Sequence, residues 1–316
     1  MFIEQGISSD NKFWKYIVGS IIIVLASTVG QIPLLLAVIA KSLSEGKGIP
    51  ENQDDIMKVF DSNTTLFLIL ISFVFAVAGV LLVIRFLHKQ TLMTIVSSRN
   101  KIDWNRVFLS FGLWSMITIV STVLLYYTHP EYFAINFQPI PFLILAIIAV
   151  LLIPIQTTCE ELVFRGYLMQ GFANLAQNKW FPLLMTSAIF GTMHIFNPEV
   201  TKVGYIILVY YIGTGLFLGI ITLMDEGMEL AIGFHAANNL IGALLVTTDW
   251  TVFQTNSILK DLSEPSAGFD IILPVVIIYP ILLIIFSKKY NWHDWQEKLT
   301  GKINSQQTEE IKKSYE

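Results

Sequence analysis

The 316-residue chain carries little charge, because only 14% of its residues are Asp, Glu, Lys or Arg. Soluble domains of this length carry roughly a quarter charged residues. Hydrophobic residues make up 54% of the chain instead. The net charge of −4 is small, and the basic residues form no Lys/Arg-rich patch or nucleic-acid-binding motif. These scarcities argue against a nucleic-acid-binding protein and favour a membrane protein.

Cysteine and the familiar protease motifs are also scarce. Cys159 is the only cysteine, which excludes an internal disulfide. No HExxH pair marks a zinc-protease helix, and no serine lies in a GxSxG context. Cys159 is a poor candidate nucleophile, because it lies about 100° from Glu160 on a helix and no histidine is fixed beside it by sequence. The common serine and zinc protease types are therefore not indicated.

Long hydrophobic runs, in contrast, are plentiful. A helix needs about 20 apolar residues to cross a bilayer core. The qualifying segments are roughly 16–40, 65–87, 107–127, 141–172, 180–197, 203–224, 227–248 and 269–286. The sequence therefore predicts an all-α, polytopic membrane bundle of about eight transmembrane helices, forming a single domain over 1–316. The segment 141–172 is over 30 residues long, so we expect it to tilt, break near Pro154 or protrude from the membrane.

The charges of the loops predict the orientation of the bundle. With the N-terminus inside, the inside segments hold 15 Lys and Arg residues and the outside loops hold five. Cytoplasmic loops carry the excess of Lys and Arg in most membrane proteins. We therefore expect a multi-pass integral protein of the cell membrane with both termini cytoplasmic, surrounded by the lipid bilayer. Residues 287–316 are polar and are expected to form a cytoplasmic tail.

Ionisable and polar residues inside the predicted spans gather in three places. They are Glu160, Glu161 and Arg165 on the fourth span, His194 on the fifth, and His235, Asn238 and Asn239 on the seventh. Counted from the cytoplasmic ends of their spans, the three groups lie within roughly one to two helical turns of the same depth. Ionisable residues inside a membrane are unfavourable and mark functional sites. We therefore predict a catalytic core within 141–248.

The helical spacing suggests how the first group divides its roles. Glu161 and Arg165 are four residues apart and share a helix face, so they can pair and make each other's burial less unfavourable. Glu160 points about 100° away from Glu161 and can face a cavity. This arrangement predicts that Glu160 is reactive, while Glu161 and Arg165 give structural support.

Two chemistries are compatible with these residue types. A carboxylate and an imidazole that share a water molecule can take its proton, while a second imidazole and a carboxamide donate hydrogen bonds to the oxyanion. Alternatively, Glu160, His194 and His235 are a three-ligand set for zinc that leaves one position open for water. The sequence leaves both versions open, so the cofactor is either zinc or none.

Two other classes of function use similar residues. A proton-coupled transporter places carboxylates and histidines inside the membrane, but it is expected to show broken helices in matching halves of the chain, and no half-repeat is visible. Single His and Asn residues can also bridge helices without any chemistry. A transporter and a non-catalytic membrane scaffold or immunity protein are therefore the alternatives to a hydrolase.

Three short motifs occur in order along the predicted core: EELVFR at 160–165, FGTMH at 190–194 and HAANN at 235–239. Together they resemble the EExxxR, FxxxH and HxxxN signatures of the CPBP family, which comprises CAAX prenyl proteases and bacteriocin-processing (Abi) proteins. The resemblance implies an intramembrane endopeptidase that acts on membrane-associated or prenylated, CAAX-like peptide or protein substrates.

The resemblance also implies a role for each motif. By similarity, Glu160 and His194 would activate the water, whereas His235 and Asn239 would form the oxyanion hole or complete a metal site. Glu161 and Arg165 would brace the first motif.

Overall fold

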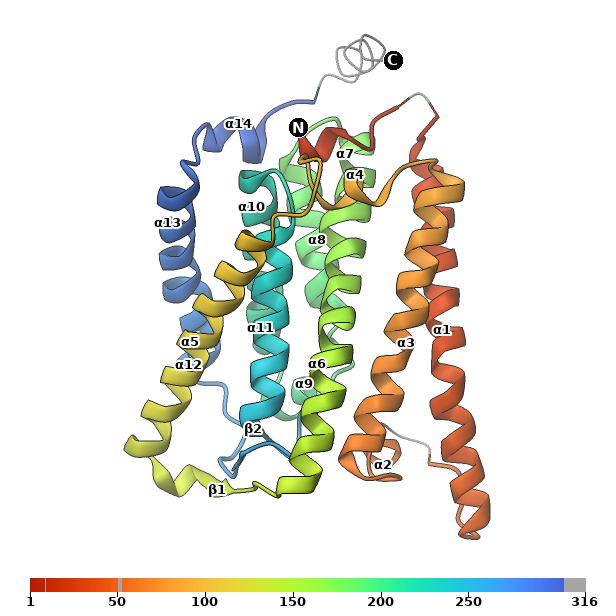
Figure 1. Cartoon of the computed structure of the whole chain (residues 1–316), viewed down its shortest axis with the longest axis vertical. Coiled ribbons are helices and arrows are strands. Elements are labelled where there is room, and N and C mark those ends of the chain that lie inside the picture. The colour runs from red at the N-terminus through yellow and green to blue at the C-terminus, as the bar shows by residue number, and fades with distance from the viewer. Residues whose placement is uncertain (9, 51–52, 304–316) are drawn as a thin grey trace.

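The structure is a computed structural model of the chain, and it describes residues 1–8, 10–50 and 53–303. Nearly all regular structure within these ranges is helical, which confirms the all-α prediction. The helices form one bundle, whose long axis is vertical in Figure 1. The N-terminus and the last described helix lie at the same end of this bundle, where the Phe2 amide donates to Glu226 and Lys298 donates to the Met224 carbonyl.

Among the described residues, six helices are long and apolar enough to cross a bilayer. They comprise α1 (Phe13–Ser44), α3 with the π-helical segment η2 (Ser62–Leu82, Val83–Leu87), α5 (Trp104–Thr128), α6 with π-helical η4 and α7 (Pro139–Glu161, Leu162–Leu168, Met169–Ala176), α10 (Ile207–Asp225), and α12 with π-helical η5 and α13 (Phe269–Leu273, Pro274–Ile278, Tyr279–Tyr290). The predicted membrane character is thus confirmed, but the predicted number of eight spans is not.

The difference in number comes from two predicted spans that form shorter helices. Helix α8 (Trp180–Thr192) has 13 residues, because the chain turns after Thr192 and Pro198 begins another helix, α9 (Pro198–Val203). Helix α11 (Glu229–Leu245) has 17 residues and packs against α5, α6 and α10. Most of its residues are buried by these neighbours. Polar groups on α11 therefore face protein to a large extent.

The remaining elements are short and lie near the ends of the bundle. They are η1 (Phe2–Glu4), α2 (Gln53–Met57), α4 (Leu92–Val96), η3 (Pro130–Tyr132), α14 (Trp295–Thr300) and the strands β1 (Phe133–Ile135), β2 (Val246–Thr247) and β3 (Leu259–Asp261). Strand β3 pairs antiparallel with β1 and parallel with β2. This small sheet lies at the end of the bundle opposite the N-terminus (Figure 1).

The long fourth segment stays helical from Pro139 to Ala176 without a break at Pro154. It changes from α-helix to π-helix at Leu162, directly after the two glutamates. A π-helical stretch widens the helix by one residue per turn, and such stretches occur often at functional sites. Of the three expected alternatives (tilt, a break near Pro154, or protrusion), the break at Pro154 is therefore excluded, and the helix becomes irregular eight residues later, at Leu162.

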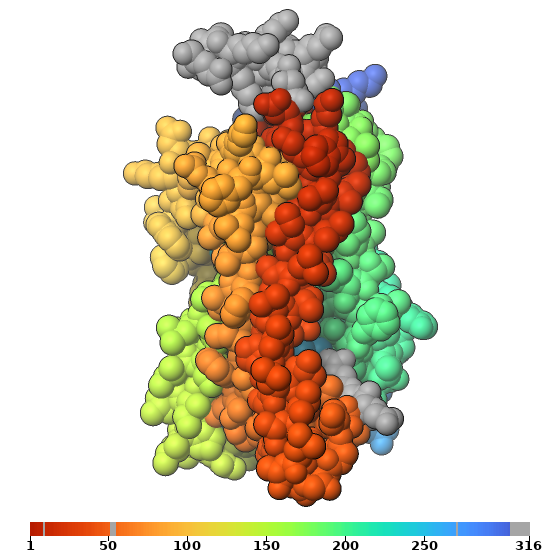
Figure 2. Space-filling model, turned by 90° about the vertical axis from the view of Figure 1, so that its right-hand side faces the viewer, coloured from red at the N-terminus to blue at the C-terminus, as the bar shows by residue number. Residues whose placement is uncertain are grey.

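Helices α1 and α3 form one side of the bundle, and α1 runs along the whole face seen in Figure 2. Their contact depends on small residues: a Cβ atom at Gly30 would lie 2.7 Å from the Ser72 Cα, and one at Gly79 would lie 2.7 Å from the Ala26 Cβ. Small residues let membrane helices approach closely. The opposite side of α1 exposes many large apolar residues, as expected where lipid is the solvent.

The described part of the predicted tail begins inside the bundle. Residues 287–290 are the last turn of α13, and α14 packs against α8 and α10. The prediction for 304–316 lies outside the described residues.

Candidate active site

The first and third motifs meet where α6 packs against α11 in the centre of the bundle (Figure 1). Glu160 and Glu161 end α6, and His235 lies in the middle of α11. His235 Nδ1 is 2.7 Å from Glu161 Oε1, and His235 Nε2 is 3.5 Å from Glu160 Oε2. The two adjacent carboxylates therefore contact the two nitrogens of a single imidazole.

Burial distinguishes the two carboxylates. The Glu161 side chain is completely buried, whereas 18% of the Glu160 side chain is exposed. An ionised carboxylate can only accept hydrogen bonds. The Nδ1–H group of His235 therefore donates a hydrogen bond to Glu161. In the neutral imidazole, Nε2 then carries the lone pair and faces Glu160. Glu160 is thus the carboxylate that an incoming water molecule can reach.

Arg165 holds Glu161 from the other side. Its guanidinium donates to Glu161 Oε1 at 3.1 Å and to the Gly215 carbonyl at 3.3 Å. It also lies 4.4 Å from the centre of the Phe190 ring, a cation–π contact. Arg165 is fully buried, and an uncompensated charge at such a place would be strongly destabilising. The predicted pairing of Glu161 with Arg165 is present in the structure.

The Glu161–Arg165 pair still has unused hydrogen-bonding capacity. Glu161 Oε2 and Arg165 Nε are buried and have no hydrogen-bond partner among the residues that the structure describes. Most buried polar groups in proteins are satisfied, and exceptions call for an explanation. One acceptor atom of Glu161 and one donor atom of Arg165 therefore lie without a hydrogen-bond partner beside Glu160 and His235.

His194 lies in the turn after α8 and not on the helix itself, contrary to the prediction. Its Nδ1 donates to the Phe190 carbonyl at 2.8 Å, and its ring stacks on Tyr211 at 4.1 Å between centroids. The Phe190 ring contacts both histidines, with centroids 5.0 Å from His194 and 5.9 Å from His235. Among the described interactions, none joins His194 directly to Glu160 or His235. The second motif reaches the site through Phe190.

The proposed zinc ligands do not come together as one set. Protein ligands stand about 2 Å from zinc, so three ligands of one ion must be close neighbours. Only Glu160 and His235 have this proximity, and the described residues contain no group of three His, Cys, Asp or Glu side chains that could hold a metal. The side chains as arranged do not fit a three-ligand zinc site, and we derive no reaction step through a metal.

Several polar residues near the motifs were not predicted from the sequence. Gln156, one turn before Glu160, donates to Glu160 Oε1 at 2.5 Å. Glu199 is buried and accepts from the Tyr211 hydroxyl at 2.6 Å. The spacing of four residues between Gln156 and Glu160 could have predicted this contact, because such residues are neighbours on a helix. The link from Glu199 through Tyr211 to His194 could not have been predicted, because it depends on how α9 packs against α10.

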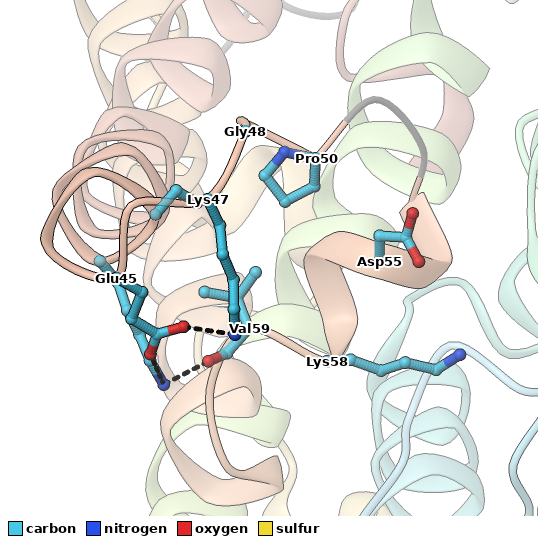
Figure 3. A pocket seen from close by; sticks show the side chains of 9 residues that line it. Glu45, Lys47, Gly48, Pro50, Asp55, Lys58 and Val59 are labelled. Carbon is cyan, nitrogen blue, oxygen red and sulfur yellow. Dashed lines mark hydrogen bonds and ion pairs between the residues drawn. The ribbon is translucent and has the colours of Figure 1, made fainter.

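A separate hollow of about 350 Å³ lies at the far end of α1, around Lys41 and Glu45. Figure 3 shows Glu45 and Lys47 on this hollow. The Lys47 Nζ is 2.7 Å from Glu45 Oε2, and Lys41 donates to the Val59 carbonyl. None of the predicted site residues lines this hollow. It is therefore distinct from the candidate active site.

Comparison with known proteins agrees with the three motifs. Residues 138–241 match the family model described as type II CAAX prenyl endopeptidase Rce1-like. This part of the chain is similar to the CAAX protease family. The matched segment contains all three motifs, while α1, α3 and α5 precede it. Similarity to this protease family supports a hydrolase role and a peptide substrate at the membrane.

The similarity to a curated relative extends over more of the chain, but this relative is uncharacterized. The uncharacterized protein YyaK of Bacillus subtilis (strain 168) is 28% identical over 250 residues, which cover 79% of this chain and 83% of the relative. No solved structure matches. The family similarity thus supports a type of enzyme, a membrane protease, and it assigns neither residue roles nor a substrate.

Proposed function

We propose that the chain is an intramembrane endopeptidase in which Glu160 and His235 activate a water molecule. The observation that carries this proposal is the 3.5 Å separation of Glu160 Oε2 and His235 Nε2, with Glu161 holding the other imidazole nitrogen. A carboxylate and an imidazole lone pair both accept hydrogen bonds. Water, with two O–H groups, is the reactant that suits such a pair.

The reaction would begin with attack of the water oxygen on the carbonyl carbon of the scissile peptide bond. Glu160 takes the proton that the water loses, as a general base. The C–N bond then breaks, and Glu160 returns the proton to the nitrogen of the leaving amine. The new carboxyl group keeps the oxygen of the water. The buried Glu161 carboxylate keeps His235 oriented, so that its Nε2 lone pair accepts a hydrogen bond from the second O–H of the water.

The developing oxyanion needs hydrogen-bond donors. One N–H of the Asn239 side-chain amide donates a hydrogen bond to Gln156. The second N–H can donate to the oxyanion. The Nδ1 proton of His194 is bonded to the Phe190 carbonyl, so His194 would donate through Nε2 only as an imidazolium. We therefore assign Asn239 as the primary oxyanion donor, with His194 beside it at the substrate.

The similarity to the CAAX protease family and the location of the site support one substrate class. We propose peptide bonds near the membrane surface of lipid-anchored, CAAX-like proteins, with both termini of the enzyme on the cytoplasmic side, as the loop charges predict. The catalytic core would comprise the residues of 141–248.

Peptide cleavage by the purified full chain tests this function. A library of prenylated, membrane-anchored peptides is incubated with wild type, Glu160→Gln and the control Glu131→Gln, each with and without a zinc chelator, and products are identified by mass spectrometry. Glu131 is exposed and lies outside the site. We expect cleavage by wild type and Glu131→Gln, loss in Glu160→Gln, and no effect of chelation. Cleavage that zinc removal abolishes and added zinc restores would overturn the metal-free mechanism.

The transporter alternative has its own measurement. If no peptide is cleaved by wild type, while vesicles containing it show a proton flux that Glu160→Gln abolishes, the endopeptidase proposal fails. A scaffold would show neither activity.

A further inference from the structure

A chain of hydrogen bonds links Glu160 to the aromatic core beside it. Gln156 Nε2 donates to Glu160 Oε1 at 2.5 Å, and Asn239 Nδ2 donates to Gln156 Oε1 at 3.0 Å. Asn238 Nδ2 donates in turn to Asn239 Oδ1 at 3.0 Å. The Asn238 Oδ1 atom accepts from the Trp114 indole N–H at 3.1 Å. Four side chains from three helices thus form a continuous chain of hydrogen bonds that ends at Glu160.

The two ends of this chain fix its direction. An indole N–H can only donate, and an ionised carboxylate can only accept. Side-chain amides can be turned by half a rotation, which exchanges their oxygen and nitrogen. With a donor at Trp114 and an acceptor at Glu160, only one orientation of all three amides satisfies every bond. Tyr210 adds a second donor to Asn238 Oδ1 at 3.3 Å, which favours the same orientation.

The surroundings strengthen this alignment. Gln156 and Trp114 are both buried, at 4% and 6% exposure. The Trp114 ring packs against Phe234 and Tyr279, with centroids 4.3 Å and 5.9 Å away. In such a low-dielectric place, hydrogen bonds in a chain polarise one another. The aligned amides therefore present a reinforced N–H donor to one oxygen of Glu160.

We propose that Trp114, Asn238 and Gln156 are positioning residues that form a directed amide relay to Glu160. The relay holds Glu160 Oε1, so that Oε2 remains for the water and His235. This inference rests on the proposed role of Glu160 as general base. None of the three residues touches the substrate in this proposal; each acts through its neighbour.

Reversing the relay is the sharpest test. In Asn238→Asp the new carboxylate cannot donate, so Asn239 must turn its NH2 group toward it. Gln156 then also turns and presents its oxygen to Glu160, which repels the carboxylate. We expect kcat to fall on the order of 100-fold, as for a misplaced catalytic group, with little change in KM. Asn238→Ala only cuts the chain and should lower kcat about tenfold, the effect of one lost hydrogen bond.

The added charge of Asn238→Asp needs its own control. The double variant Asn238→Asp with Gln156→Leu interrupts the relay between Asp and Glu160. If the charge acts through the relay, this double variant has the kcat of Gln156→Leu alone. A further loss in the double variant would mean that the charge acts through space or by turning the oxyanion donor Asn239, and it would overturn the relay to Glu160 as the cause. Thermal unfolding of each purified variant shows whether it is folded.

A second measurement is independent of any substrate. Indole N–H signals of 15N-labelled protein in detergent report the Trp114 donor, and its signal is assigned by its absence in Trp114→Phe. Neutralising the far end of the relay with Glu160→Gln should shift the Trp114 signal. The isosteric Glu199→Gln neutralises a carboxylate outside the relay and should leave the signal in place.

The two measurements separate the two proposals. If the Trp114 signal responds to Glu160→Gln in a protein that cleaves no peptide, the result supports the relay and contradicts the endopeptidase proposal. Cleavage that depends on Glu160 but is equal in wild type, Asn238→Ala and Asn238→Asp overturns the relay and leaves the endopeptidase intact. A Trp114 signal that shifts equally in Glu199→Gln also overturns the relay.

Discussion

The protein contains two buried clusters of ions that differ in how well their atoms are satisfied. The site cluster consists of Glu160, Glu161, Arg165 and His235. The terminal cluster lies at the end of the bundle that carries the N-terminus and consists of Arg99, Asp103, Arg106, Asp225 and Glu229. Each cluster contains at least one carboxylate that is almost completely buried, namely Glu161 in the site cluster and Asp225 and Glu229 in the terminal cluster, yet only the terminal cluster pairs these groups fully.

In the terminal cluster, Arg99 bonds to both Asp225 and Glu229 at 2.9 Å, and Arg106 bonds to Asp225 at 2.8 Å. The Trp292 indole donates to the remaining oxygen of Asp225. Within the described residues, none of its buried side-chain polar atoms lacks a partner. In the site cluster, Glu161 and Arg165 each keep an unpartnered atom. A saturated cluster holds helices together, whereas an unsaturated one keeps capacity for a reactant.

The largest expected effect is on rate, in the site cluster. Glu160→Gln keeps the shape of the side chain and removes the base, so the cleavage rate should fall 100- to 10,000-fold, the usual range for general acid–base groups. The thermal unfolding midpoint should stay the same or rise, because a buried charge is removed. Rate measurements and thermal unfolding of one purified sample check both. A fall in stability without a loss of rate would make Glu160 structural.

The next effect concerns the stability of the same cluster. Arg165→Met leaves the Glu161 carboxylate buried without its partner, so unfolding should become easier by about 3–5 kcal/mol. Denaturant unfolding in detergent measures the change. The double variant Arg165→Met with Glu161→Leu removes both charges and should recover much of the loss. If it recovers nothing, packing and not charge explains the effect.

Sequence reasoning located the helices of the bundle and the residues that gather in it. It did not foresee that Glu160 and Glu161 both contact His235, because the approach of α6 to α11 depends on packing that no local pattern encodes. His194 was expected on a helix, but the chain leaves α8 two residues earlier. The two short helices were counted as spans because hydrophobicity continues beyond the point where each helix ends.

A smaller effect is expected in the terminal cluster. Asp225→Asn deprives Arg99 and Arg106 of a shared carboxylate, which should lower the free energy of unfolding by about 2–3 kcal/mol. The kcat per folded molecule should not change, because Asp225 contacts no site residue. Active-site titration of the folded fraction, followed by rate measurement, separates the two quantities. A change in kcat would mean that the two clusters are coupled.

The smallest effect is a dependence of stability on pH. His88 lies just beyond the end of η2, where it contacts Asn11 and Tyr167. Burial, and then the charge of Lys15, lower the pKa of His88 from its usual 6.5 to about 4. Its neutral form stabilises the fold fully above pH 6.5, and this contribution is lost as the pH falls toward 4.

We expect this loss to be about 1–2 kcal/mol, because residual solvent contact reduces the full linkage value. Thermal midpoints of wild type between pH 7 and 4 measure it. His88→Asn should have a flatter profile over the same range. Parallel profiles for the two proteins would remove His88 as the cause.

The shortness of α8 has a consequence for the surrounding lipid. Thirteen residues of helix extend about 20 Å, some 10 Å less than a typical hydrocarbon core. A bilayer meets a short hydrophobic element by thinning next to it. The turn that follows α8 carries His194 and exposes Met193 and Phe196, and thinning would bring the aqueous phase closer to this turn. We expect water and an extended peptide to have their shortest route to Glu160 through this thinned part of the bilayer.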